Sequence, residues 1–152
     1  MNFLIISPKY PIWYWNFDRV LNYFPSVLSF PPLILLNLSS MLPKVWNKKL
    51  IDMNTRNLND EDILWADYVL INAKIIQAKS ANKIIERCRK LNTKTVACGS
   101  LFKNNDEYYK YIDYLVCDES EITLPQFLSD LAEEKTKRKF ESKTYSNITS
   151  AY

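Results

Sequence analysis

The chain has 152 residues, of which 47% are hydrophobic, and it carries a formal net charge of +3. This length and apolar content suit one domain with a sizeable core. The sequence contains no histidine and one glycine, Gly99. The lack of histidine excludes imidazole metal ligands and every Ser-His or Cys-His nucleophile pair. The scarcity of glycine excludes a GxGxxG dinucleotide fingerprint and a Walker A loop.

No stretch of the sequence predicts export or membrane insertion. The N-terminal residues 1–8 lack the charged region of a secretory signal. The longest apolar run, at 30–38, is too short for a membrane span and contains prolines. Three cysteines, an odd number, argue against a disulfide framework. The basic run at 135–139 reads as a solvated tail, because no aromatic platform for nucleic acid accompanies it. We therefore expect a cytoplasmic protein without a nucleic-acid partner.

Apolar runs and helical stripes alternate along the chain. Continuous β-rich runs predict buried parallel strands at 3–6, 45–51, 68–71, 95–98 and 114–117. Proline, capping residues and helical periodicity predict helices at 33–42, from 59 onwards, at 78–91, at 106–111 and at 122–134. This alternation predicts a doubly wound α/β fold, with a five-stranded parallel sheet in the flavodoxin-like, or Rossmann-like, order 2-1-3-4-5. We assign residues 1–134 to this domain and 135–152 to a polar linker or tail.

The connection after the first strand is rich in aromatic side chains, with Trp13, Tyr14, Trp15 and Phe17 close together. Two interpretations are open. The cluster is either a satellite core under the loop or an exposed surface that docks on another domain. The second interpretation predicts that the isolated domain self-associates.

The ends of the predicted strands carry the candidate ligand-binding residues, because ligands of open α/β sheets lie beyond the carboxyl ends of the strands. These ends are Ser7-Pro8, Asp52-Met53-Asn54, Asn72-Ala73, Gly99-Ser100 and Glu119. Asp52 and Asn54 also suit an Asx turn, in which the side chains bond the local backbone. Glu119 suits a helix N-terminus, where the dipole stabilises an acid. The spacing yields no acid–base couple, so we expect no turnover from the chain alone.

Short motifs in a fixed order span nearly the whole chain. They are Ser7-Pro8-Lys9-Tyr10-Pro11 with Trp15, Phe30-Pro31-Pro32-Leu33, Met41-Leu42-Pro43 with Trp46, Asp52-Met53-Asn54, Trp65-Ala66-Asp67, Gln77 with Ser80, Gly99 with Leu101-Phe102, and Glu119 to Phe127. In this set the chain resembles the N-terminal cobalamin-binding domain of cobalamin-binding radical SAM proteins. The resemblance implies a Rossmann-like domain that holds the corrin over the carboxyl edge of its sheet.

The resemblance also implies which residues bind the cofactor. They are Ser7, Pro8, Pro32, Asp52, Met53, Asn54, Asn72, Ala73, Gly99, Ser100 and Glu119. Residues 52–54 would line the lower corrin face, residues 72–73 the nucleotide tail, and residues 99–100 the side of the pocket. Asn54 stands where better-known corrinoid carriers have a histidine ligand, so cobalt would receive no imidazole.

The radical chemistry of the family implies a partner. The CxxxCxxC iron–sulfur motif is absent, since Cys88, Cys98 and Cys117 are too widely separated to form it. The iron–sulfur cluster and SAM would therefore belong to a radical SAM domain, in cis or in trans, which the aromatic loop at 13–17 would contact. Cys98 is expected to act as a small hydrophobe in the core rather than as a thiol facing cobalt.

Two other interpretations remain open. Ile34 and Cys98 stand where the family usually has glycine, which lets a backbone approach a flat ligand closely. The chain could accordingly be a truncated or degenerate docking domain that has lost cobalamin. A third interpretation is an unrelated flavodoxin-like binding domain, although the chain lacks the phosphate loop of an FMN site.

Overall fold

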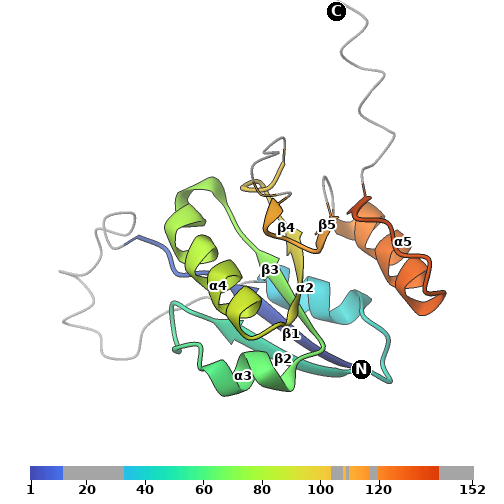
Figure 1. Cartoon of the computed structure of the whole chain (residues 1–152), viewed down its shortest axis with the longest axis horizontal. Helices are drawn as coiled ribbons and strands as arrows, with labels where there is room; N and C mark the ends of the chain where they lie inside the picture. The colour runs from blue at the N-terminus through green and yellow to red at the C-terminus, as the bar shows by residue number, and fades with distance from the viewer. Residues whose placement is uncertain (12–32, 104–107, 109, 117–119, 141–152) are drawn as a thin grey trace, which may run out of the picture.

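The fold is a parallel α/β sheet with helices on both faces (Figure 1). The computed structural model describes residues 1–11, 33–103, 108, 110–116 and 120–140. Its strands are β1 (Asn2–Ser7), β2 (Asn47–Asp52), β3 (Tyr68–Asn72), β4 (Lys94–Cys98), β5 (Tyr114–Val116) and β6 (Lys139–Phe140). They pair in parallel in the order β2-β1-β3-β4-β5-β6. The predicted doubly wound fold and the order 2-1-3-4-5 are therefore confirmed.

Helices alternate with these strands as the sequence predicts. The described helices are α2 (Leu33–Met41), α3 (Asp60–Trp65), the short 3-10 helix η2 (Ile75–Gln77), α4 (Ala78–Lys90) and α5 (Ser120–Ala132). Helices α3 and α4 pack on one face of the sheet, and α2 and α5 pack on the other. None of the helices in this part of the chain is long and apolar enough to cross a membrane.

Strand β1 lies between two cores, which explains its unbroken apolar sequence. Leu4 and Ile6 point to the face covered by α3 and α4, and Phe3 and Ile5 point to the face covered by α2 and α5. All four side chains are completely buried. A strand buried on both faces has no polar position, so it reads as a continuous hydrophobic run.

Six aromatic rings form what we call the aromatic ladder on the α2 and α5 face. Its rungs are Trp46, Phe3, Tyr68, Tyr114, Phe127 and Phe140, in that order. Successive ring centroids are 5.1 to 6.1 Å apart, within the range of favourable aromatic contacts. Phe3 and Tyr68 lie near the beginnings of β1 and β3, whereas Phe140 is in register with Val116, which pairs with Cys98 at the end of β4. The ladder therefore crosses the sheet obliquely, from its amino edge toward its carboxyl edge.

The sheet extends beyond the domain boundary predicted at residue 134. The Leu115 N–H donates a hydrogen bond to the Arg138 carbonyl at 2.8 Å, and Phe140 in β6 is 5% exposed. The basic run at 135–139 is therefore not wholly a solvated tail, and the sheet has a sixth strand. A strand of two residues with one apolar side chain has no periodicity that a sequence pattern could reveal.

Other predictions fall outside the described residues. They concern the aromatic loop at 13–17, half of the predicted helix at 106–111, Cys117, and the candidate ligand-binding residues Pro32 and Glu119.

Candidate functional site

The parallel register brings the predicted strand-end residues to one edge of the sheet. Ser7 pairs with Asp52, and Asn72 pairs with Cys98. The chain passes from β1 through α2 to β2 over one face, and returns through α3 to β3 over the other. The strand order therefore reverses beside β1, and the carboxyl edge at such a switch point is where open α/β sheets bind ligands. The loops at 7–8, 52–54, 72–73 and 99–100 all follow strands that end there.

The loop after β2 is an Asx turn, as one of the two predictions for it states. Oδ1 of Asp52 accepts hydrogen bonds from the backbone N–H of Asn54 at 3.0 Å and from its side-chain amide at 2.6 Å. The Asp52 carbonyl also accepts the N–H groups of Thr55 and Arg56, at 3.1 and 3.0 Å. These bonds fix both the backbone of the turn and the direction of the Asn54 side chain.

This turn is joined to the loop after β1. Oδ1 of Asn54 accepts a hydrogen bond from the backbone N–H of Tyr10 at 2.8 Å. The Met53 N–H donates to the Ser7 carbonyl at 3.0 Å. Both polar atoms of the Asn54 side chain are thus engaged within the protein, because its amide nitrogen bonds Asp52.

The same β1 loop is held on its other side by the start of α4. The Gln77 side chain, 2% exposed, donates a hydrogen bond to the Pro8 carbonyl and accepts the Lys74 N–H at 2.8 Å. The Lys9 N–H donates to Oγ of Ser80 at 3.0 Å. Sequence reasoning assigned no role to Gln77 and Ser80. Both residues belong to the ordered motif set, and this membership was the sign that they contribute to the site. In the structure they bond the loop after β1, which contains other members of the set.

Gly99 closes the loops after β3 and β4 against each other. Its φ is +99°, and a Cβ there would lie 2.5 Å from the Ala73 carbonyl oxygen and 2.6 Å from Oδ1 of Asn72. The Ala73 N–H bonds the Cys98 carbonyl, and the Leu101 N–H bonds the Ala73 carbonyl, both at 3.0 Å. The space left by the missing side chain is filled by the protein's own residues.

The two described cysteines, Cys88 and Cys98, are buried in opposite cores. Cys98 packs there as a small hydrophobe, as predicted. Burial raises the pKa of the Cys88 thiol to about 12, although the charge of Arg87 lowers it in part. The Cys88 thiol is therefore protonated at neutral pH and is not a nucleophile.

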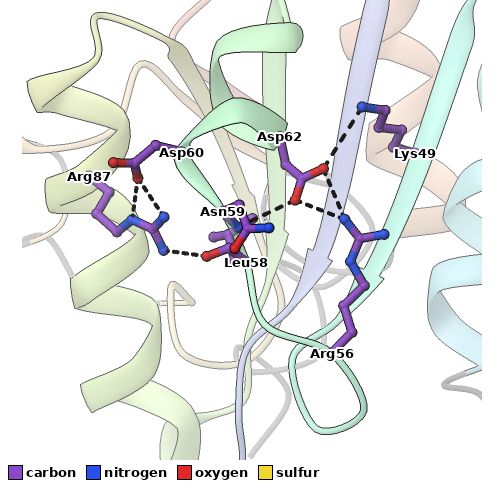
Figure 2. Close-up of polar contacts among 7 residues, drawn as sticks. All are labelled: Lys49, Arg56, Leu58, Asn59, Asp60, Asp62 and Arg87. Atoms are coloured by element: carbon purple, nitrogen blue, oxygen red, sulfur yellow. Dashed lines mark hydrogen bonds and ion pairs between the residues drawn. The ribbon is translucent and has the colours of Figure 1, made fainter.

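A buried carboxylate holds the far end of the loop after β2 (Figure 2). Nη2 of Arg56 donates to both carboxylate oxygens of Asp62, at 2.9 and 2.8 Å, and the Asn59 N–H bonds Asp62 at 3.3 Å. Nζ of Lys49 lies 3.8 Å away. Burial alone would raise the pKa of Asp62. The hydrogen bonds from Arg56 and Asn59 and the charges of Arg56 and Lys49 outweigh it, and the pKa is lowered.

A second ion pair ties α3 to α4 beside this carboxylate (Figure 2). Nε of Arg87 donates to the Asp60 carboxylate at 2.9 Å, and Nη1 donates to the Leu58 carbonyl at 3.0 Å. The sequence predicts the start of α3 from its capping residue and leaves the acids of the first turn without partners. It missed their arginine partners, one of which belongs to another helix.

Among the described residues, those of the carboxyl edge do not form a metal centre. In the part of the chain that the structure describes, no three His, Cys, Asp or Glu residues are grouped so that they could hold a metal ion. Because the polar atoms of Asn54 are engaged with Asp52 and Tyr10, Asn54 cannot replace the missing histidine without breaking the turn. Cobalamin held at this edge would accordingly receive no ligand from Asn54.

Comparison with known proteins relates the chain to part of a longer one. No family model matches it. It is 34% identical over 139 residues to a protein of Synechocystis sp. named as an uncharacterized methyltransferase. The match covers 90% of this chain and 26% of the relative, so the chain spans about a quarter of that protein's length.

Proposed function

We propose that the chain is a cobalamin-binding module of a radical SAM-type methyltransferase, that it leaves cobalt without a histidine ligand, and that it has no catalysis of its own. One observation carries this proposal. The motifs behind the family resemblance, at residues 7–10, 52–54, 77 and 80, form one hydrogen-bonded network at the carboxyl edge beside the switch point. The name of the relative supports a connection with methyl transfer.

Each loop of the edge has a role in this proposal. Residues 7–8 and 52–54 would lie under the corrin, residues 72–73 beside the nucleotide tail, and residues 99–100 at the side of the pocket. When bound, cobalamin would supply a reactive cobalt centre. The protein would hold the ring in a fixed place and present it to the partner domain, which would carry the iron–sulfur cluster and SAM.

Titration of the purified chain with hydroxocobalamin tests the proposal. We expect a base-off visible spectrum and an affinity on the order of micromolar. An unchanged spectrum, with no cobalamin retained after gel filtration, would contradict the proposal.

Two matched substitutions locate the binding surface. Ser100→Trp adds a bulky side chain at an exposed position of the edge, and Val45→Trp adds the same side chain at a position that is 86% exposed before β2. We expect Ser100→Trp to weaken hydroxocobalamin binding about tenfold or more, which corresponds to roughly 1.4 kcal/mol. The affinity of Val45→Trp should match that of the unsubstituted chain. Equal affinities for the two variants would place the ligand away from this edge.

A second candidate function is a docking domain that has lost cobalamin. It is favoured by Gly99, because the space over this glycine is filled by Asn72 and Ala73 and not left open to a ligand. This candidate predicts no spectral change with hydroxocobalamin, together with a stable complex when a radical SAM domain is added. The hydroxocobalamin titration separates the two functions, and analytical ultracentrifugation of that mixture tests the docking that this candidate requires.

A further inference from the structure

We infer that Asn54 is a positioning residue that makes the loops after β1 and β2 move as one unit. The functional consequence of this link is that both loops contact the ligand at the carboxyl edge from fixed positions, and this consequence rests on the proposed function. The link between the loops does not, and it can be tested in the protein without ligand.

The Asn54 side chain has both the direction and the reach that this role requires. Two hydrogen bonds to Oδ1 of Asp52 hold its backbone and its amide nitrogen, at 3.0 and 2.6 Å. Its oxygen is thereby aimed at the backbone N–H of Tyr10, which lies 44 residues away in the chain and 2.8 Å away in space. A short turn at the end of β2 thus sets where the β1 loop lies.

Asn54, in the turn after β2, contacts the outer end of the loop after β1. Ser7 is fixed by the Met53 N–H, and Pro8 and Lys9 are fixed by Gln77 and Ser80. Tyr10 is the next residue, and its N–H is held from the β2 side by Asn54. This bond adds a contact from the β2 side to the hydrogen bonds that Gln77 and Ser80 make from the α4 side.

The role is local because Asn54 is exposed and belongs to neither core. Replacing it removes little buried surface, so the fold persists while the loop is released. Opening of a surface loop is measured by amide hydrogen exchange, which separates local from global unfolding.

The first test is the exchange rate of the Tyr10 amide, measured by NMR in Asn54→Ala and in the control Asn57→Ala. Asn57 is also exposed and lies three residues further along the same loop. We expect exchange at Tyr10 to be about tenfold faster in Asn54→Ala and unchanged in Asn57→Ala, with equal urea midpoints for global unfolding. An unchanged rate in Asn54→Ala would overturn the inference.

A second test exchanges the carboxylate and the amide between positions 52 and 54. Asn54→Asp places a second carboxylate where the amide nitrogen bonds Asp52, and two carboxylates so close repel each other. We expect this variant to release Tyr10. The double variant Asp52→Asn with Asn54→Asp restores a donor and an acceptor in reversed positions, and it should recover the protection of Tyr10. Failure of the double variant to recover protection would count against the link through Asp52.

A third test measures the affinity of the two alanine variants for hydroxocobalamin. We expect the affinity of Asn54→Ala to be about tenfold weaker than that of Asn57→Ala. Equal affinities combined with faster exchange at Tyr10 would overturn the positioning role. If the unsubstituted chain does not bind hydroxocobalamin, the proposed function fails, while the exchange rates still decide whether Asn54 links the two loops.

Discussion

Gly99 is the residue at which the fold and the candidate site compete for the same space. Its positive φ of +99° is open to glycine and strained for other residues. Oxygen atoms of Ala73 and Asn72 lie 2.5 and 2.6 Å from the position that a Cβ would take, too close for a carbon atom there. The sequence shows a lone glycine after a strand, which is enough to place it at the ligand edge. The sequence cannot show that the Ala73 backbone lies against Gly99, because this contact depends on the pairing of β3 with β4.

We predict that Gly99→Ala destabilises the protein by about 2 to 4 kcal/mol, from backbone strain and the forced movement of the Ala73 carbonyl. Urea unfolding followed by circular dichroism would measure this. The neighbouring Ser100→Ala, at an exposed position, should change the free energy of unfolding by less than about 0.5 kcal/mol. Equal stabilities for the two variants would show that the loop after β3 yields to a methyl group.

At the scale of elements, α3 depends on its ionic contacts. It has six residues, and a helix this short is not stable in isolation. Ile63 anchors it in the core, and Asp62 and Asp60 tie its first turn to Arg56 and Arg87. The sequence predicts the start of this helix correctly from Asn59 and the acids that follow. The two arginines were unpredictable because one is in a loop and the other is in α4.

Asp62→Asn should destabilise the protein by about 1 to 3 kcal/mol at pH 7, because it leaves the Arg56 guanidinium without its carboxylate. The folded-state pKa of Asp62 is lowered, so the carboxylate contributes stability above its unfolded pKa of about 3.9. This contribution is lost as the pH falls through the folded pKa. The difference between Asp62→Asn and the unsubstituted protein should therefore shrink as the pH is lowered below about 4.

Urea unfolding at a series of pH values measures this difference. Glu61→Gln is the matched control, since Glu61 is an exposed acid in the same turn. A pH-independent difference for Asp62→Asn, or an equal effect of Glu61→Gln, would mean that the ion pair with Arg56 adds no stability.

At the scale of the whole molecule, the sequence predicted the layers, five strands and their order, because β1, β3, β4 and β5 bury apolar runs and β2 buries Ile51 beside them. It did not predict β6, where a single buried side chain, Phe140, carries the packing. It also predicted which loops share the carboxyl edge. It could not predict the hydrogen bonds between them, since partners such as Asn54 and Tyr10 are 44 residues apart and meet only through loop conformation.

Phe140→Ala tests whether β6 is part of the fold. We expect a loss of about 2 to 4 kcal/mol in the free energy of unfolding, because the ring packs against Phe127 at 5.5 Å between centroids. Lys137→Ala, at an exposed position in the preceding segment, should leave the stability unchanged within about 0.5 kcal/mol. If both variants unfold at the same urea concentration as the unsubstituted protein, β6 contributes nothing to the sheet.

The aromatic ladder begins where β1 and β3 begin and ends at Phe140, which is in register with the end of β5, while the candidate ligand loops follow the ends of β1 to β4. The ladder is built from side chains of one core, and the candidate ligand-binding residues are in the loops. During evolution the loops can drift, and a cofactor can be gained or lost, while the ladder keeps the architecture intact. A working carrier and a domain that no longer carries anything would share this fold, and only ligand binding distinguishes them.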